Sequence, residues 1–358
     1  MRSAHRALLS TAMLLLPVPF AGAAPSGPVL GATSDCRPEA PALDEERFVR
    51  IGGIEQWVTI RGSDCRNPVI LFLHGGPGSP LSPYASAIYG AWEAGFTLVQ
   101  WDQRGTARTY GRNPPEADSA LTLERMTQDG LELTSYLIDH LDADKLILVG
   151  GSWGSALGVH MVTQRPELFH AYLGTGQLVS YQENQASTYR NLLELARAAE
   201  DTVTTMALEA LGPPPWTDPR NAGIVRRATR SYEARTTTPA PDSWWEAAAE
   251  YASPRLQDDR EAGDDYSYLQ FVGYAGDGMF SRIDLRRLGT DFEVPVYLIQ
   301  GAEDLVTTTE VARAYFDSIE APAKALVVLP RTGHDPNEAM LDAQYEILTN
   351  RVIPSIDR

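Results

Sequence analysis

Short runs of consecutive apolar residues recur along the chain, and segments of helical periodicity alternate with them. Runs of this kind, with no polar residue at every second position, are typical of strands buried on both faces. They occupy residues 68–73, 96–101, 145–149, 171–174, 294–300 and 325–329. Helical periodicity occupies residues 121–141, 155–164 and 337–352. This alternation predicts an α/β fold with a mostly parallel central sheet and helices on both faces.

A different pattern precedes the first of these runs. Residues 47–61 alternate between apolar and polar side chains on either side of Gly52-Gly53. Period-two alternation around a glycine pair predicts a β-hairpin. With this hairpin, the segment at 171–174 becomes the sixth strand of the sheet.

The alternation of strands and helices stops between residues 177 and 290. This segment holds helical stretches at 185–211 and 244–251, which proline-rich sequences separate. We therefore expect a helical cap, inserted after the sixth strand between the two parts of the core at 45–176 and 291–358. Aromatic side chains gather in the cap, where they either line an apolar pocket or form the cap's own core. They are Trp216, Trp244, Trp245, Tyr266, Tyr268, Phe271, Tyr274 and Phe280.

The first residues have the pattern of an export signal. Arg2 and Arg6 flank an apolar run at residues 7–20, and Ala21-Gly22-Ala23 resembles a cleavage site. The run is short for a membrane span and contains two prolines. We predict a signal peptide at 1–23 and a proline-rich leader at 24–44; an uncleaved anchor is the alternative. Cleavage would leave a secreted or periplasmic protein without a membrane attachment.

Net charge limits the class of partner, and the cysteine content predicts a disulfide. The net charge of −17 argues against a nucleic-acid partner, because no basic patch offsets the repulsion from phosphates. The only cysteines are Cys36 and Cys65. In an exported protein such a pair indicates a disulfide, which would join the leader to the turn after the hairpin. Two buried free thiols are the alternative.

The segment after the strand at 145–149 carries the strongest chemical signal. Gly150-Gly-Ser-Trp-Gly154 places Ser152 between that strand and a helix. A serine on such a sharp turn exposes its hydroxyl, and glycines at 150 and 154 avoid collisions between a Cβ atom and the neighbouring elements. The amino terminus of the helix favours a developing oxyanion nearby. We predict that Ser152 is a nucleophile.

A serine nucleophile needs a base and an orienting carboxylate, which follow it along the chain in folds with this turn. Of the histidines, only His334 comes late in the sequence and directly after a predicted strand. Asp304 also follows a strand end, and the nearby Glu303 and Asp335 are its competitors. Because such groups gather at the carboxyl ends of the strands, we expect a Ser152–His334–Asp304 triad.

An oxyanion needs two aligned main-chain N–H groups. One is expected from Trp153, the residue after the nucleophile, and the other from the loop His74-Gly-Gly-Pro-Gly78. Pro77 has no donor, so Gly76 is the first choice in that loop and Gly75 the second.

Together these motifs resemble the proline iminopeptidase (prolyl aminopeptidase) group of α/β hydrolases. The resemblance rests on the glycine-rich loop at 74–78, Asp102-Gln-Arg-Gly105, Gly150-Gly-Ser-Trp-Gly-Ser155, the Asp304 segment and Gly333-His334. It covers roughly residues 48–176 and 294–358. It implies the same triad and the same oxyanion donors, Gly76 and Trp153. It also implies that Asp102 and Arg104 are structural and brace the oxyanion loop.

The resemblance implies release of N-terminal proline, or another small residue, from short peptides. Glutamates of the family's cap hold the substrate's free amine, and Glu183 and Glu246 are the candidates here, although the cap does not align with the family's cap. The segment after Gly105 departs too: it reads Thr-Ala-Arg-Thr, where the family commonly has Ser-Gly-Arg-Ser.

Two other functions remain open at this stage. A secreted carboxylesterase, or a lactone or amide hydrolase, would use the same machinery on a different small substrate. A non-catalytic binding protein on this scaffold would have no need of the serine, aspartate and histidine set. The chain has no metal-binding or nucleotide-binding motif, so we expect neither a metal nor a cofactor. The sequence does not predict an oligomeric state.

Overall fold

The computed structural model describes residues 41–76, 78–115 and 120–356. The predicted signal peptide, most of the leader and Cys36 lie outside the described residues, so these predictions stay predictions. Cys65 is buried and disulfide-bonded. None of the helices within these ranges is long and apolar enough to cross a bilayer.

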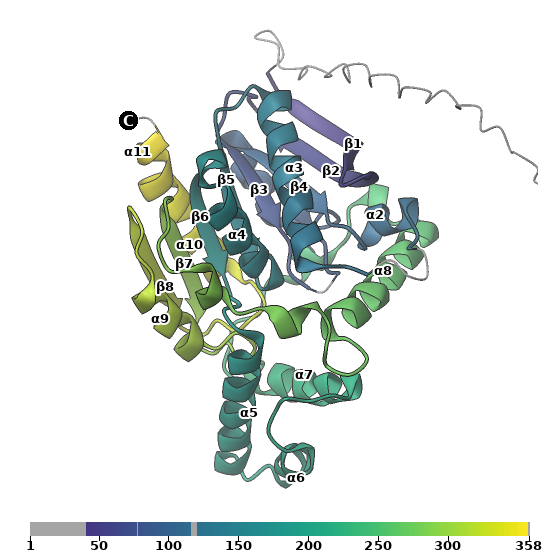
Figure 1. Ribbon diagram of the computed structural model, residues 1–358, viewed down its shortest axis with the longest axis vertical. Coiled ribbons are helices and arrows are strands. Elements are labelled where there is room, and N and C mark those ends of the chain that lie inside the picture. The colour runs from purple at the N-terminus through teal and green to yellow at the C-terminus, as the bar shows by residue number, and fades with distance from the viewer. Residues whose placement is uncertain (1–40, 77, 116–119, 357–358) are drawn as a thin grey trace, which may run out of the picture. The chain divides into compact units, whose positions relative to one another are not determined.

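Eight strands form one sheet in the order β1-β2-β4-β3-β5-β6-β7-β8 (Figure 1). β2 pairs antiparallel with β1 and β4, and the other neighbours pair in parallel. The strands are β1 (Leu43–Ile51), β2 (Ile54–Gly62), β3 (Val69–Leu73), β4 (Thr97–Asp102), β5 (Leu146–Gly151), β6 (Phe169–Thr175), β7 (Val296–Gly301) and β8 (Lys324–Leu329). The predicted fold class is confirmed.

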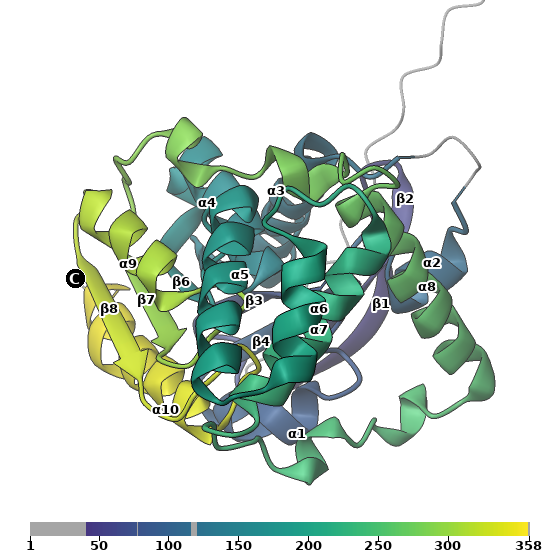
Figure 2. The same ribbon diagram turned by 90° about the horizontal axis from the view of Figure 1, so that it is seen from below.

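The sheet separates two apolar cores, because successive side chains of a strand point to opposite faces. In β3, Leu71 and Leu73 join one core, whereas Ile70 and Phe72 join the other. Helices cover both faces, as Figures 1 and 2 show. They are α1 (Ala85–Tyr89), α2 (Ala107–Arg112), α3 (Leu123–Leu141), α4 (Trp153–Gln164), α9 (Thr309–Ser318), α10 (Glu338–Ile347) and α11 (Ile353–Ile356).

The first strand begins earlier than the sequence pattern predicted. β1 starts at Leu43, so it includes two residues of the predicted leader, and the hairpin pairs from Leu43 opposite Gly62 to Ile51 opposite Ile54. The three consecutive charged residues Asp44-Glu-Glu46 interrupt the alternation of apolar and polar residues, so the pattern did not predict the start of this strand. Arg61 on β2 neutralises that edge by pairing with both Asp44 and Glu46.

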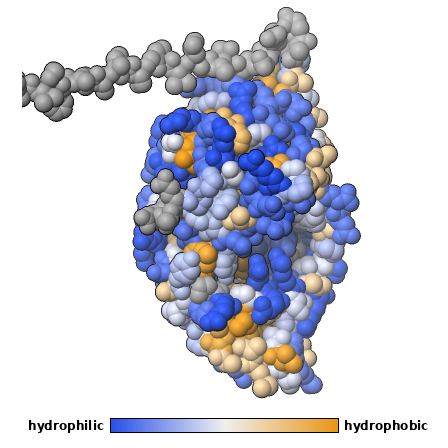
Figure 3. All heavy atoms as spheres, turned by 90° about the vertical axis from the view of Figure 1, so that its right-hand side faces the viewer, coloured by the Kyte–Doolittle hydropathy of each residue, from blue (hydrophilic) through white to orange (hydrophobic). Residues whose placement is uncertain are grey.

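The cap follows β6 and contains α5 (Tyr181–Ala198), α6 (Thr202–Leu211), α7 (Pro219–Glu233) and α8 (Pro254–Val272). α5, α6 and α7 lie together at one end of the sheet, whereas α8 extends beside α2 (Figures 1 and 2). Apolar surface gathers at the lower end of Figure 3, the end at which α6 lies in Figure 1. The exposed large apolar residues of α6 are Val203 and Met206.

Two details of the cap differ from the expectation. The helical stretch at 185–211 is broken, because Glu200 has a positive φ and the Asp201 side chain caps α6 by accepting from the Thr204 N–H. The stretch at 244–251 forms only short 3-10 turns. The sequence pattern did not predict α7 and α8, because both helices carry many charged residues, which leave no clear apolar periodicity.

Candidate active site

Ser152 lies on a strained turn between β5 and α4. Its φ of 52° and ψ of −118° lie outside the regions that non-glycine residues commonly adopt. The surrounding packing enforces this turn. A Cβ atom at Gly154 would lie 2.0 Å from the Leu73 carbonyl oxygen, and one at Gly150 would lie 2.4 Å from the Gly154 carbonyl oxygen. The two glycines therefore have the role that the sequence pattern predicted for them.

The structure brings the three predicted triad residues into one hydrogen-bonded chain. His334 Nε2 lies 2.9 Å from Ser152 Oγ, and His334 Nδ1 lies 3.0 Å from Asp304 Oδ2. Ser152 follows β5, Asp304 follows β7 and His334 follows β8, so all three come from the carboxyl ends of parallel strands. This is the arrangement in which a histidine accepts a serine proton while a carboxylate orients the ring.

The Asp304 carboxylate is buried and held in place by several donors. Oδ1 accepts the main-chain N–H groups of Val306 and Thr307, each at 2.8 Å. Oδ2 accepts the Thr307 hydroxyl and the Gln300 side-chain amide, each at 2.8 Å. These bonds fix the carboxylate against His334 and compensate its loss of solvent.

His334 is held close to several negative charges. Burial alone would lower its pKa, but the charge and hydrogen bond of Asp304, with smaller effects of Glu233 and Asp335, raise the pKa to about 9. The side chain is 16% exposed. The imidazolium that forms when His334 accepts a proton is therefore strongly stabilised at this site.

Glu233, at the end of α7, is a residue of the site that the sequence did not reveal. Its carboxylate accepts the Leu305 N–H at 2.7 Å and the His334 N–H at 3.3 Å, and so joins the cap to both the acid loop and the base loop. Burial raises its pKa to about 7, and the nearby charge of Asp304 adds to this effect. In the sequence, Glu233 is one of many cap carboxylates, and no neighbouring motif distinguishes it.

The predicted oxyanion loop lies against the nucleophile turn. A Cβ atom at Gly75 would lie 3.2 Å from both Ser152 Cβ and the Gly151 carbonyl oxygen. Gly76 has a φ of +129°, a conformation that requires glycine. Trp153 is completely buried, and its ring packs edge-on against Phe271 of the cap with 4.6 Å between centroids. The loop and the turn thus lie close enough for both predicted donors to serve one site.

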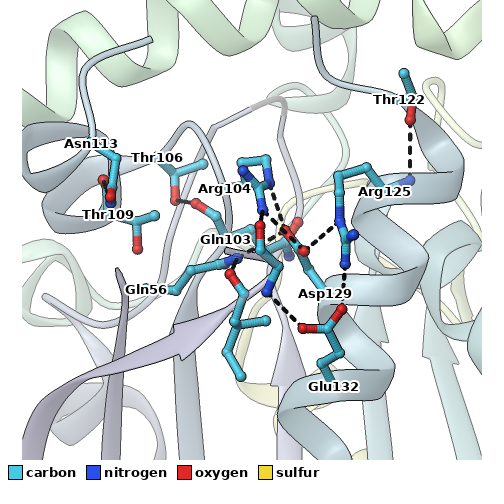
Figure 4. Close-up of polar contacts among 12 residues, drawn as sticks. Gln56, Gln103, Arg104, Thr106, Thr109, Asn113, Thr122, Arg125, Asp129 and Glu132 are labelled. Carbon is cyan, nitrogen blue, oxygen red and sulfur yellow. Dashed lines mark hydrogen bonds and ion pairs between the residues drawn. The ribbon is translucent and has the colours of Figure 1, made fainter. Parts of the chain in front are cut away.

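The Asp102-Gln-Arg-Gly105 segment, expected to brace the oxyanion loop through Asp102 and Arg104, does so through a different residue. Asp102 accepts the Ser82 hydroxyl and the Arg108 N–H. Arg104 instead pairs with Asp129 on α3, with 2.7 Å between Nε and Oδ2 (Figure 4). It is Gln103, between the two, that contacts the oxyanion loop.

The predicted amine-binding glutamates do not contact the triad. Glu183 is exposed and pairs with Arg286 at 2.6 Å, so its charge is already neutralised at the surface. Glu246 is exposed after a short 3-10 turn. Among the competitors for the acid, Glu303 accepts the Thr332 N–H and Asp335 is exposed. Of the cap carboxylates that the structure describes, Glu233 contacts both triad loops.

A second cap carboxylate lies on the oxyanion side. A Cβ atom at Gly78 would lie 2.9 Å from Asp264 Cα and 3.2 Å from its Oδ1. Burial raises the pKa of Asp264, and the neighbouring Asp265 adds to the effect. Glu233 and Asp264 therefore place one cap carboxyl group beside the triad loops and another beside the glycine-rich loop.

Comparison with known proteins identifies the family. A model of the α/β hydrolase fold matches residues 68–338. The chain belongs to the α/β hydrolase fold family. The chain is 28% identical over 309 residues to a probable aminopeptidase of Bacillus subtilis, covering 84% of this chain and 93% of the relative. It is 25% identical over 299 residues to a probable proline iminopeptidase of Leptolyngbya boryana, covering 82% and 88%.

A solved structure agrees at the level of the fold. The proline iminopeptidase of Mycobacterium smegmatis superposes with a TM-score of 0.60 at 19% identity, covering 87% of this chain and 96% of that one. The α/β hydrolase is thus an enzyme similar to proline iminopeptidases, and the resemblance noted in the sequence is confirmed. Within the described residues, no group of three or more histidine, cysteine or acidic side chains is arranged to hold a metal ion.

Proposed function

We propose that this hydrolase is an exported aminopeptidase that releases N-terminal proline, or another small residue, through an acyl-enzyme on Ser152. The observation that carries the mechanism is the hydrogen-bonded chain from Ser152 through His334 to Asp304. The named relatives support the substrate class, because they span most of this chain and of their own lengths.

Acylation follows from the geometry. Ser152 Oγ donates its hydrogen bond to His334 Nε2, so its proton moves to that nitrogen as Oγ attacks the carbonyl carbon of the first residue. Asp304 accepts from Nδ1 and stabilises the imidazolium. The carbonyl oxygen becomes an oxyanion facing the N–H groups of Gly76 and Trp153. His334 then gives its proton to the leaving nitrogen, and the shortened peptide departs.

Deacylation repeats these steps with water. His334 Nε2 takes a proton from a water molecule, whose oxygen attacks the ester carbon on Ser152. The second tetrahedral intermediate collapses, the C–Oγ bond breaks, and the proton returns to Oγ. The free amino acid leaves and the enzyme returns to its starting state.

We propose Glu233 as the main counter-charge for the substrate's ammonium group, with Asp264 as its partner. An aminopeptidase must neutralise a positive charge one carbon away from the scissile carbonyl. Glu233 lies beside the triad and is buried, and its carboxylate accepts main-chain N–H groups, with no ion pair to a lysine or arginine among the described residues. An ammonium bound there would favour its ionised form.

A side-by-side assay tests the function. We expect proline p-nitroanilide to be cleaved faster than alanine p-nitroanilide, and N-acetylproline p-nitroanilide to be resistant. Ser152→Ala should lose at least about 10³-fold in kcat on every substrate. Turnover of a short p-nitrophenyl ester without any anilide cleavage would instead identify a carboxylesterase on the same fold.

A second assay tests the counter-charge. Glu233→Gln should raise KM for proline p-nitroanilide by about 10-fold or more, while changing KM for an uncharged ester much less. Glu183→Gln removes a carboxylate already paired with Arg286 and is the matched control. Glu246→Gln and Asp264→Asn complete the set. Equal losses on amine and ester substrates would show that Glu233 only supports the loops.

We also propose that residues 1–23 direct export and are removed after Ala23. The support is the charged, apolar and small-residue pattern of the sequence. Amino-terminal sequencing of the protein recovered from cell fractions tests this proposal. A start at Ala24 outside the cytoplasm is expected, and an intact Met1 in the cytoplasm would contradict it.

A further inference from the structure

Gln103 connects the two halves of the oxyanion site. It is completely buried just after β4. Its side-chain Nε2 donates to the His74 carbonyl oxygen at 3.2 Å, and its Oε1 accepts the Trp153 indole N–H at 2.9 Å. One amide group therefore bonds to both segments that carry the proposed oxyanion donors.

The main chain of Gln103 adds a third bond to the same loop. Its N–H donates to His74 Nε2 at 3.3 Å, so the His74 proton lies on Nδ1, which donates to the Gly75 carbonyl oxygen at 2.7 Å. Burial lowers the pKa of His74 to about 4, opposed by its bond to Gly75, so the ring stays neutral at physiological pH. The His74 ring thus connects the Gln103 main chain to Gly75, the residue that precedes Gly76, through one hydrogen bond on each side.

We infer that Gln103 is a positioning residue, which sets the separation of the Gly76 and Trp153 N–H groups and thereby the stabilisation of the oxyanion. It is completely buried, and its side-chain hydrogen bonds go to His74 and Trp153 rather than to a residue of the triad. Its effect should therefore concern the transition state, where the oxyanion exists, and leave ground-state binding unchanged. This inference rests on the proposed acyl-enzyme mechanism.

The test is a kinetic comparison of variants in the full-length enzyme. Gln103→Met removes both side-chain bonds at similar length and volume. Gln103→Glu keeps an acceptor for Trp153 but puts an acceptor in place of the donor to His74. Trp153→Phe removes the indole donor and, with it, part of a ring that packs against Phe271. Gln100→Met is the matched control, since Gln100 is a buried glutamine on β4, three residues before Gln103, and its Nε2 has no hydrogen-bond partner among the described residues.

We expect Gln103→Met to lower kcat on a short ester about 10- to 100-fold, with KM within about threefold of the parent value. The affinity for an alkyl boronic acid, which forms a tetrahedral adduct on the serine, should fall by the same factor. Binding of the product carboxylic acid should not change. Trp153→Phe should give part of this loss in kcat. Adding it to Gln103→Met should lower kcat little further, because both changes break the same hydrogen bond.

Other outcomes overturn the inference. A kcat for Gln103→Met no lower than that of Gln100→Met would do so, as would equal losses in boronic-acid and product affinity. If Gln103→Met fails to fold, a wild-type kcat in both Gln103→Glu and Trp153→Phe contradicts the inference, and a lowered kcat at constant KM supports it. Retained activity in Ser152→Ala would instead refute the proposed mechanism itself.

Discussion

At the scale of single residues, the site depends on a histidine surrounded by negative charge. His334 must be neutral to accept the Ser152 proton, and its neighbours raise its pKa to about 9. In the proposed mechanism a protonated His334 cannot act as a base, so we expect activity to be lost as the pH falls below that pKa.

This electrostatic arrangement predicts the pH dependence. The kcat/KM for an uncharged ester should rise about tenfold per pH unit below the apparent pKa and level off only well above pH 6.5. Asp304→Asn and Glu233→Gln should each move the limb to lower pH, because each removes a negative charge that stabilises the imidazolium. A pH–rate profile measures this, and a parent limb centred at the ordinary histidine pKa would contradict the account.

The glycines of the nucleophile turn yield a second prediction. Gly154→Ala places a methyl group 2.0 Å from the Leu73 carbonyl oxygen, so β3 and α4 must separate. We expect a loss of about 3 kcal/mol or more in unfolding free energy, together with loss of activity. Gly90→Ala meets nothing within 4 Å and is the control. Urea unfolding monitored by circular dichroism measures both, and equal stabilities would contradict the packing argument.

The sequence predicted the residues of the triad better than those of the cap, for a physical reason. Ser152, Asp304 and His334 each follow a strand that an apolar run marks in the sequence, so the sheet order alone brings them together. Glu233 reaches the same site through the packing of the cap, which leaves no local pattern. For the same reason, the sequence did not reveal that Glu183 forms an ion pair with Arg286, which lies far along the chain.

At the scale of elements, a buried ionic cluster joins the hairpin, the loop after β4 and α3 (Figure 4). Asp129 is completely buried and accepts from Arg104, Arg125 and Gln56 at 2.7–2.8 Å. Arg104 also donates to the Gly52 carbonyl oxygen at the hairpin turn. The cluster therefore holds the antiparallel edge of the sheet against the part of the fold that carries Gln103.

Removing the shared carboxylate should be costly. Asp129→Ala leaves two arginines without their buried partner, and we expect a loss of about 3–5 kcal/mol in unfolding free energy. Glu132→Gln changes a half-exposed partner of Arg125 in the same cluster and should cost about 1 kcal/mol or less. Urea denaturation of both variants measures the difference. Similar losses would show that burial does not determine the strength of this cluster.

The strands after β1 were predicted closely, because burial in a sheet selects continuous apolar runs. Of the core helices, α3, α4 and α10 were predicted, whereas α1, α2, α9 and α11 were not. The cap was not predicted closely. The Asp201 cap ends a stretch that reads as one helix, and the charged face of α8 conceals its packing against α2. Helices that pack on only one side keep polar residues elsewhere, so their apolar signal is diluted.

At the scale of the whole molecule, the single cysteine pair should stabilise the fold without taking part in catalysis. Pairing of Cys36 with Cys65 would close a loop of about 30 residues, for which chain entropy suggests about 3.5 kcal/mol. The double variant Cys36→Ser/Cys65→Ser should lose stability of that order and keep kcat within about twofold. Urea unfolding with and without dithiothreitol measures this. Unchanged parent stability in the reductant would contradict it.

The core and the cap contribute different parts of one site. In the proposed mechanism, the core supplies the nucleophile, base, acid and oxyanion loop, whereas the cap supplies Glu233 and the Phe271 ring against Trp153.

Active-site labelling with a fluorophosphonate, followed by peptide mass spectrometry and the proline p-nitroanilide assay on the same samples, tests directly whether proline release depends on Ser152. We predict one phosphonyl group per chain on Ser152, no label in Ser152→Ala, and loss of proline release in proportion to labelling. Labelling of another residue, or proline release that persists in the fully labelled enzyme, would contradict an aminopeptidase that acts through Ser152.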